Sequence, residues 1–275
     1  MTTSELRDID FEKISRFVHG LCGINLHDGK RELVKARLSK RLREGNFRSF
    51  ADYFEFVTTE DGTDELINMI DSLSTNLTSF FREEKHFRKL HEIVADMAQT
   101  SSRTHHVPVL RMWCAGCSTG EEPYSLAMTV KETMGAHAVK LNILASDISR
   151  RVLRTAMAGI YPAERVRKIP YSLLRKYFQI GNGQWNGYYR VKKELKDVVE
   201  FTRFNLMDTL SYAEPFDIIF CRNVMIYFNK KTQATLVDRF YSCLRDGGWL
   251  FVGHSESLTG LAHPFKYIEP SIYRK

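Results

Sequence analysis

No apolar run in this 275-residue sequence approaches the ~20 residues that a membrane-spanning helix needs. The first residues are polar and of mixed charge, so they do not resemble a secretory signal peptide. The cysteines number only five, and this odd count favours reduced thiols over a disulfide framework. These absences predict a cytoplasmic protein without membrane insertion.

Several motifs of common enzymes are absent or incomplete. The small-residue segment 114–120 lacks the GxxxxGK[ST] pattern of a P-loop. Segment 253–257, GHSES, has a serine where the nucleophile turn of serine hydrolases needs a second glycine. Cys114 and Cys117 form a CxxC pair without the proline usual in thioredoxin-type sites, and no second pair completes a zinc site. We therefore expect no metal and neither redox nor hydrolase chemistry.

The formal net charge of +7 predicts an acidic partner, either a nucleic acid or an acidic protein surface. Part of this charge lies in a predicted helix at 30–44, whose apolar stripe is Val34, Leu38 and Leu42. The basic side chains beside the stripe are Lys30, Arg37, Lys40 and Arg41. They form either an ordinary solvated helix face or a docking surface for an acidic helix.

Hydrophobic periodicity divides the chain into two parts. Helical spacing of apolar residues predicts an all-helical domain over residues 1–85, and alternating strands and helices predict an α/β domain over 86–275. The strand pair near the C-terminus favours a methyltransferase sheet over a dehydrogenase sheet. The expected helices of the first part and its border span 10–20, 30–44, 50–57, 65–73 and 88–104, and the expected strands span 109–113, 140–145, 198–204, 216–221, 249–253 and 267–273.

Residues 160–200 interrupt the alternation of strands and helices. Turn signals at 181–183 and 186–187 predict a small antiparallel β-subdomain, inserted at about 179–197. Its exposed edge is either a plain surface hairpin or a place where a peptide adds as a strand.

A ligand cleft is expected where strand 109–113 meets its helix. The strand ends in the small residues 114–120, as in the first half of nucleotide-binding α/β folds. Asp147 ends the next strand, where a carboxylate either binds ribose hydroxyls or caps the following helix. The hydroxyls and aromatic rings of segment 74–82, STNLTSFFR, either line the same pocket or cap a helix and pack between the domains.

Six motifs in order resemble the CheR family of chemotaxis receptor methyltransferases. They are SxNxTxFFR at 74–82, AxxSTGEEPYS at 115–125, SD at 146–147, FNL at 204–206, CRNVMIYF at 221–228 and GHSE at 253–256. The resemblance covers essentially the whole chain. It implies a class I S-adenosylmethionine-dependent, Rossmann-like methyltransferase sheet behind an N-terminal all-helical domain. It also implies an enzyme that methylates glutamate side chains on the signalling helices of chemoreceptors.

The resemblance further implies which residues form the site. Contacts to S-adenosylmethionine are implied for Asn76, Thr78, Arg82, Glu122, Asp147, Asn205, Leu206, Arg222 and Asn223. Arg82 is implied near the methionine carboxylate and the reacting centre, and Tyr227 at the rim near the substrate. The CxxC of the loop departs from the family, which more often has small residues without thiols there, and it adds a sensitivity to oxidation.

A glutamate substrate needs no general base, because a carboxylate with a pKa near ~4.3 is already ionised at neutral pH. This agrees with the absence of a Ser/His/Asp arrangement or of paired carboxylates from the sequence. The acidic receptor helices provide a partner for Lys30, Arg37, Lys40 and Arg41, and a receptor C-terminal peptide is a candidate ligand of the β-subdomain. We expect a monomer.

Two other functions are open at this point. A nucleic-acid methyltransferase would also use a basic helix. Against it, no Asn/Asp-Pro-Pro-aromatic motif follows strand 216–221, where Arg222 and Asn223 stand instead. The second is a non-catalytic protein that senses the cofactor on the same fold, although every motif of the family is intact.

Overall fold

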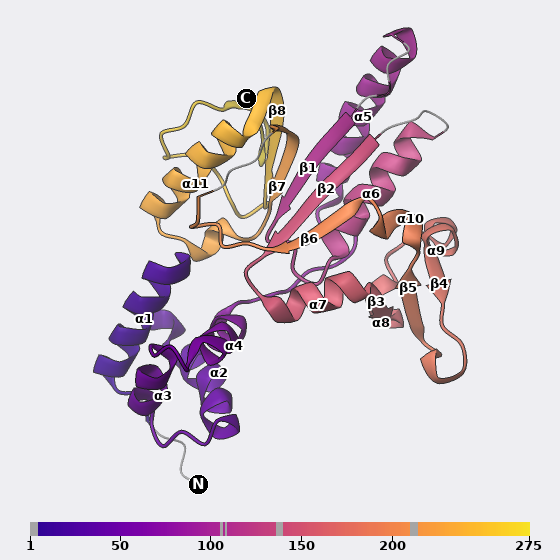
Figure 1. Cartoon of the computed structure of the whole chain (residues 1–275). Helices are drawn as coiled ribbons and strands as arrows, with labels where there is room; N and C mark the ends of the chain where they lie inside the picture. Colours follow the sequence, from indigo (N-terminus) through magenta and orange to yellow (C-terminus); the bar gives the residue numbers. More distant parts are fainter. Residues whose placement is uncertain (1–4, 105–106, 108, 136–139, 210–213) are drawn as a thin grey trace.

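The computed structural model describes residues 5–104, 107, 109–135, 140–209 and 214–275. The N-terminal part is helical, and an α/β domain follows it (Figure 1). No helix in the described ranges is long and apolar enough to cross a membrane. The N-terminal helices, which confirm the predicted helical part, are α1 (Asp8–Cys22), α2 (Arg31–Glu44), α3 (Phe50–Val57) and α4 (Thr63–Leu73).

One polar cluster joins three of these helices. Arg41 of α2 donates from Nε to Oε1 of Glu65 on α4 at 2.9 Å, and the Tyr53 hydroxyl of α3 donates to the same oxygen at 2.9 Å. Tyr53 is fully buried, and burial raises the pKa of its hydroxyl, so the hydroxyl stays a donor. The Arg41 guanidinium is therefore used inside the helical domain, which its predicted docking role did not anticipate.

The α/β domain is built on a seven-stranded sheet in the order β6-β2-β1-β7-β8-β10-β9. The five strands from β6 to β8 are parallel, and β10 and β9 are antiparallel at one edge. The strand order reverses between β1 and β7, so the sheet is doubly wound with its switch point there, as the α/β prediction requires. The strands are β1 (Val109–Ala115), β2 (Lys140–Asp147), β6 (Val199–Arg203), β7 (Phe216–Cys221), β8 (Leu244–Val252), β9 (Lys266–Glu269) and β10 (Ile272–Arg274).

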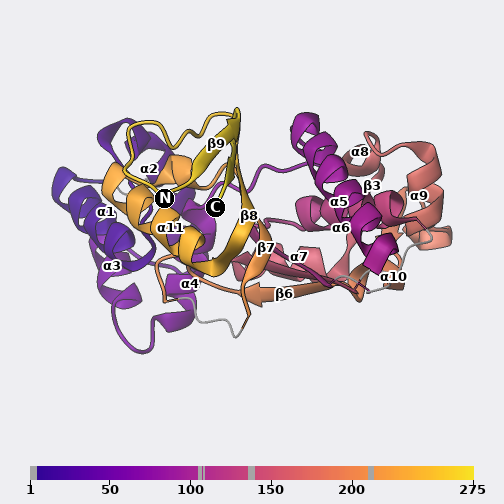
Figure 2. The same ribbon diagram turned by 90° about the horizontal axis from the view of Figure 1, so that it is seen from above.

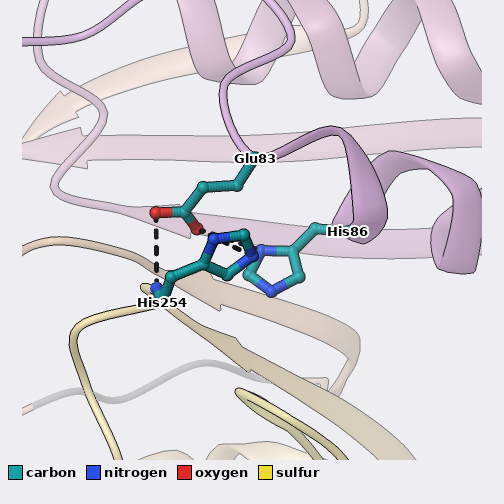
Figure 3. A group of neighbouring side chains, drawn as sticks. All are labelled: Glu83, His86 and His254. Carbon is teal, nitrogen blue, oxygen red and sulfur yellow. Dashed lines mark hydrogen bonds and ion pairs between the residues drawn. The ribbon is translucent and has the colours of Figure 1, made fainter.

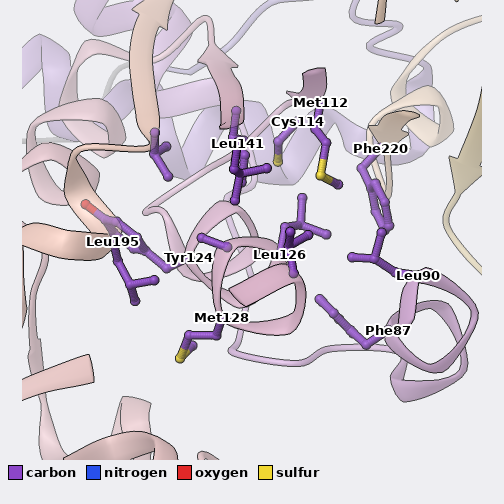
Figure 4. Packing of buried hydrophobic residues seen from close by; sticks show 14 of the residues in the cluster. Phe87, Leu90, Met112, Cys114, Tyr124, Leu126, Met128, Leu141, Leu195 and Phe220 are labelled. Carbon is purple, nitrogen blue, oxygen red and sulfur yellow. The ribbon is translucent and has the colours of Figure 1, made fainter. Parts of the chain in front are cut away.

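Helices cover both faces of the sheet (Figure 2). On one face lie α5 (Glu84–Thr104) and α6 (Glu121–Met134), and α11 (Lys230–Cys243) lies on the other with the helical domain. The alternation of β1 divides its side chains between the two faces. Met112 and Cys114 pack with Phe87 of α5 and Leu126 of α6 (Figure 4), whereas Trp113 packs on the opposite side.

The helical domain and the sheet share one buried core. Leu38 of α2 and Phe11 of α1 belong to the same apolar cluster as Trp113 of β1 and Phe240 of α11. Because protein interiors are close-packed, this continuous core fixes the two parts against each other. The segment that crosses between them, residues 74–83, therefore has a defined path beside the sheet.

A second, antiparallel sheet has the strand order β3-β5-β4. The hairpin of β4 and β5 was predicted, but β3 lies before the expected range of 179–197. A three-residue strand that ends in Pro162 has too short an alternation to be detected in a sequence. The elements of this region are β3 (Ile160–Pro162), α8 (Ala163–Val166), α9 (Tyr171–Tyr177), β4 (Phe178–Ile180), β5 (Tyr188–Val191) and α10 (Lys193–Lys196).

The C-terminal strands also differ from the prediction. β8 begins at Leu244, directly after α11, rather than at residue 249. The strand predicted at 267–273 is two strands, β9 and β10, with a turn at Ser271. Ser271 has a φ of 65°, a turn conformation that its residue type does not announce in the sequence.

A substitution at Gly120 tests how closely the start of α6 approaches Ala156 and Tyr161. It precedes α6 with a φ of 95°, and a Cβ there would lie 2.8 Å from both the Ala156 Cβ and the Tyr161 hydroxyl. We expect Gly120→Ala to lower the free energy of unfolding by about 1–3 kcal/mol, measured by urea denaturation. The control is Gly20→Ala in α1, where a Cβ meets open space and the free energy should rise by up to about 1 kcal/mol. Equal effects of the two substitutions would contradict this packing.

Candidate active site

A pocket lies at the carboxyl ends of β1, β2 and β7, against the segment that links α4 to α5. Doubly wound sheets bind their ligands in this crevice. We call residues 74–83 the linker. Among the residues that the sequence analysis implicated, the pocket is lined by Asn76, Thr78, Arg82, Glu122, Asp147, Leu206, Arg222, Asn223 and Tyr227. The sheet and the linker thus contribute to a single site.

The loop after β1 presents backbone to this pocket. Gly116 has a φ of 82°, and a Cβ at this position would lie 2.4 Å from the Val224 Cγ2, which is a steric overlap. The amides of Gly116 and Cys117 donate to the Ser146 carbonyl at 2.8 and 2.9 Å, which fixes the loop to β2. The Ser118 hydroxyl donates to the Asn76 carbonyl at 2.9 Å and joins the loop to the linker.

Asp147 ends β2 and lines the pocket with its residue 8% exposed. Its Oδ2 accepts from the Ser118 amide and its Oδ1 from the Ser149 amide, each at 2.9 Å. Burial raises the pKa of the carboxyl, and the two hydrogen bonds oppose the rise. Because each carboxylate oxygen has a second lone pair, Asp147 can organise the backbone and still accept a ligand hydroxyl. The two roles predicted for Asp147, binding of ribose hydroxyls and capping of the following helix, are therefore compatible.

The Arg222 guanidinium is almost completely buried and joins three segments. Nη1 donates to Glu122 Oε2 on α6 at 2.9 Å, and Nη2 lies 3.0 Å from Glu83 Oε2 on the linker. Nη2 also donates to the Arg82 carbonyl. Burial alone would raise the pKa of Glu83, but the charge of Arg222 and hydrogen bonds outweigh it, so the pKa is lowered. The linker, α6 and the end of β7 are thereby held together behind the pocket.

Glu256 shapes the loop that follows β7. Its buried carboxylate accepts from the amides of Gly253 at 2.6 Å, Asn223 at 2.8 Å and Ile226 at 3.1 Å. Burial raises the pKa of this carboxyl against the effect of those bonds. Sequence reasoning noted Glu256 only as a member of the GHSE motif and assigned it no role. A glutamate among small residues just after a strand was the one signal available.

Arg37 of α2 holds the linker from the side of the helical domain. Its Nη1 donates to the carbonyls of Leu73 at 2.7 Å and Ser74 at 3.2 Å, and its Nη2 donates to Thr75 Oγ1 at 3.0 Å. Ser74 and Thr75 line the pocket. The predicted docking residue Arg37 therefore positions the pocket wall with the same guanidinium.

Lys30 lies against Tyr227, which lines the pocket. The Tyr227 hydroxyl donates to the Thr75 carbonyl at 3.5 Å, and the Lys30 Nζ lies 5.3 Å from the centre of the Tyr227 ring. Burial lowers the pKa of Lys30, and the charge of Arg37 adds to this effect. Lys30, one of the predicted docking residues, thus contacts Tyr227, the residue expected near the substrate.

Arg82 lies on the linker and donates from Nη1 to the Leu77 carbonyl at 2.8 Å.

Asn205 differs from the other predicted cofactor residues because it is not among the residues that line the pocket. Its side-chain amide donates to the Leu21 carbonyl at the end of α1 at 2.8 Å, and its Oδ1 accepts from the Met207 amide at 3.1 Å. These bonds position the neighbouring Leu206, which does line the pocket. The structure thus gives Asn205 a supporting role beside the pocket, and its direct contact to the cofactor stays a prediction.

The CxxC pair is buried behind the loop. Cys114 donates from Sγ to Glu122 Oε1 at 3.2 Å, and Cys117 donates to the Ser118 carbonyl at 3.8 Å. Burial raises the pKa of both thiols well above the usual range. The reactive thiolate is therefore disfavoured, which argues against the sensitivity to oxidation considered from the sequence.

Comparison with known proteins agrees with this geometry. Residues 76–274 match the family described as CheR methyltransferase, SAM binding domain, and residues 9–74 match the CheR methyltransferase all-alpha domain. The chain is 42% identical to Chemotaxis protein methyltransferase 2 of Pseudomonas aeruginosa, over 96% of this chain and 92% of that protein. It is 39% identical to the chemotaxis protein methyltransferase of Escherichia coli, over 98% of this chain and 91% of that protein. The chain belongs to the CheR methyltransferase family.

This membership confirms the resemblance seen in the sequence. The CheR chain is an S-adenosylmethionine-dependent methyltransferase with a class I, Rossmann-like sheet and an N-terminal all-alpha domain. Its two matched parts meet between residues 74 and 76, at the start of the linker. The pocket described above therefore lies where the two parts of the family meet.

Substitution of Glu256 tests how the loop after β7 is held. Glu256→Gln keeps the side-chain size but replaces one accepting oxygen with an NH₂ group, so a buried amide loses its acceptor. We expect the free energy of unfolding to fall by about 1–3 kcal/mol and S-adenosylhomocysteine to bind more weakly, by urea denaturation and calorimetry. Glu200→Gln, on the exposed side of β6, should change neither quantity. Wild-type stability of Glu256→Gln would show that the carboxylate does not organise this loop.

Proposed function

We propose that this CheR chain transfers a methyl group from S-adenosylmethionine to the γ-carboxylate of specific glutamates on chemoreceptor helices. The product is a glutamate methyl ester, as chemotaxis adaptation requires. The names of the relatives, chemotaxis protein methyltransferases, support the pathway. The chemistry of the pocket supports a carboxylate as the acceptor.

The observation that carries the proposal is the lack of a free general base among the described residues that line the pocket. Neither histidine nor lysine is among them. Glu122 is paired with Arg222, and Asp147, which holds two backbone amides, is assigned to the ribose hydroxyls of the cofactor. Burial raises the pKa of the Cys22 thiol to about 11. An acceptor that is already an anion at neutral pH needs no base, and a glutamate carboxylate is such an acceptor.

The side chains of the pocket fit S-adenosylmethionine. Asp147 offers two acceptors to the ribose hydroxyls, and Ile148, Phe204 and Leu206 give apolar surface for the adenine ring. Arg82 brings a guanidinium that suits the methionine carboxylate, because the planar group binds a carboxylate through two parallel hydrogen bonds. Bound there, the cofactor supplies an electrophilic sulfonium methyl group.

The protein contributes placement and the exclusion of water. Charge is lost as a carboxylate attacks a sulfonium methyl group, so a water-poor site favours the transition state. Correct orientation of the reactants is worth up to ~7–11 kcal/mol. We assign Tyr227, beside the linker, to positioning of the acceptor. Arg82 is assigned to the cofactor, because tight pairing with the nucleophile would weaken it.

Acidic receptor helices are proposed to dock on α2 beside Tyr227. The Lys40 side chain is 72% exposed, and Lys30 contacts the Tyr227 ring. Arg37 and Arg41 use their donors within the chain, so they contribute charge to this face rather than direct contacts. The proposal therefore makes Lys40 the clearest test of docking.

A second receptor contact is proposed at the three-stranded sheet. β4 is an edge strand, and Ile180, Trp185 and Tyr188 beside it are 54%, 51% and 41% exposed. A receptor C-terminal peptide that adds as a strand would cover these apolar side chains. The enzyme is proposed to act as a cytoplasmic monomer that does not bind nucleic acid.

Incubation with methyl-labelled S-adenosylmethionine and receptor-containing membranes tests the proposal. A carboxyl methyl ester releases volatile labelled methanol in mild base, and we expect this release only when receptor is present. Base-stable label in added nucleic acid would favour a nucleic-acid methyltransferase instead. No transfer to either acceptor would favour a non-catalytic protein that senses the cofactor.

Arg82→Ala tests the cofactor contact. Loss of hydrogen bonds to a charged group costs about 1.5–3 kcal/mol, so we expect S-adenosylmethionine to bind about 10- to 150-fold more weakly, with a matching fall in kcat/KM. Arg88→Ala, on the exposed face of α5, is the matched control and should leave both quantities unchanged. Near-normal binding and turnover of Arg82→Ala would remove Arg82 from the proposed site.

Lys40→Glu tests the docking surface. Charge reversal on an exposed face should raise the KM for receptor about two- to tenfold and leave the KM for the cofactor unchanged, measured by initial rates at low ionic strength. Arg37→Glu should weaken cofactor binding as well, because Arg37 holds the linker. Lys13→Glu, exposed on α1, controls for net charge. An unchanged receptor KM in Lys40→Glu would contradict docking at this face.

A further inference from the structure

Glu83, His86 and His254 form a compact cluster behind Arg222, and none of the three lines the pocket described above. One potential ligand atom from each lies within 4.8 Å of the others. Figure 3 shows the Glu83 carboxylate facing the two imidazole rings, which come from α5 and from the loop after β8. The Glu83 Oε2 lies 3.3 Å from His86 Nδ1 and 4.0 Å from His254 Nε2.

The His86 ring has no hydrogen bond to explain its burial. The residue is 1% exposed, and neither ring nitrogen makes a hydrogen bond. The 3.3 Å contact from Nδ1 to the Glu83 carboxylate does not have hydrogen-bond geometry. Buried polar groups without partners are rare and costly, so such a group calls for a ligand. Imidazole nitrogens are common ligands of transition-metal ions.

The charges around the cluster favour a cation. Arg222 is paired with two carboxylates, those of Glu83 and Glu122, so the buried group carries one excess negative charge. A carboxylate that binds a metal is ordinarily also hydrogen-bonded by an outer partner, and Arg222 is placed to be that partner of Glu83. The His254 side chain is 48% exposed, which gives an ion access to the cluster from solvent.

We propose that Glu83, His86 and His254 bind a divalent transition-metal ion, of which Zn²⁺ is the best match, with water as a fourth ligand. Two histidines and one carboxylate are a common zinc donor set. Tetrahedral ligands about 2.0–2.1 Å from the ion are about 3.3–3.4 Å apart, the spacing already present between Glu83 and His86. The His254 Nε2 lies 4.0 Å from Glu83 Oε2 and has to move closer to both partners to join them.

This site departs from the expectation of no metal that came from the sequence. That expectation considered cysteine pairs at short spacing, whereas these ligands come from two segments that the sheet brings together. A metal here would bridge the start of α5 to the loop after β8. It would also fix Glu83 on the linker, and through Arg222 it would stabilise the back wall of the pocket.

Calorimetric titration of the chelator-treated, full-length protein with ZnCl₂ tests the proposal. We expect one ion per chain, and His254→Ala should weaken the affinity at least about tenfold. His27→Ala, which removes an exposed histidine between α1 and α2, is the matched control and should bind as the wild type does. Titration with Co²⁺ should give visible absorption bands of a four-coordinate ion that His254→Ala loses.

Two results would overturn the site. One is a wild-type protein that takes up no Zn²⁺ or Co²⁺, and the other is His254→Ala that binds both as tightly as the wild type. His86→Ala would remove a ligand too, but it also opens a cavity in the core. The decision therefore rests on His254, whose half-exposed side chain can be truncated with little effect on folding.

Discussion

The architecture of the pocket depends on one buried guanidinium. Arg222 lies directly after the central strand β7. Its Cζ is 5.7 Å from the centre of the Phe87 ring and 6.0 Å from the centre of the Phe220 ring. A charge in such surroundings is tolerated only while it is paired. Glu83 and Glu122 must therefore stay within reach, and this requirement fixes the linker and α6 relative to the sheet. The ion pairs determine geometry more than they add stability.

The same constraint explains why the helical domain is part of the site. The linker is held by Arg222 from the sheet side and by Arg37 from α2. The Ser118 hydroxyl then joins the linker to the loop after β1. A site closed by two domains excludes water better than an open sheet edge. The proposed methyl transfer to a carboxylate, in which charge is lost, benefits from that exclusion.

The sequence predicted what depends on local pattern, and it missed what depends on contacts between distant segments. The apolar run of β7 and the position of Asp147 after β2 follow from periodicity and from the switch-point rule. The role of Arg37 could not be predicted in this way, because a basic residue on a helix has the same sequence pattern whether it faces solvent or a carbonyl 36 residues away. Glu256 was missed for the same reason, since two of its three partners, the amides of Asn223 and Ile226, belong to another loop.

Backbone strain is concentrated around the same pocket. In the described ranges, six residues other than glycine have a positive φ, and four of them are Phe81, Glu83, Ser118 and Asn223. Each such residue costs on the order of 1–3 kcal/mol and persists only where its surroundings determine the backbone. Asp147 holds the amide of Ser118, and Glu256 holds the amide of Asn223. Polar side chains at the back of the pocket thus act first on the backbone, and the shape that they impose is what a ligand meets.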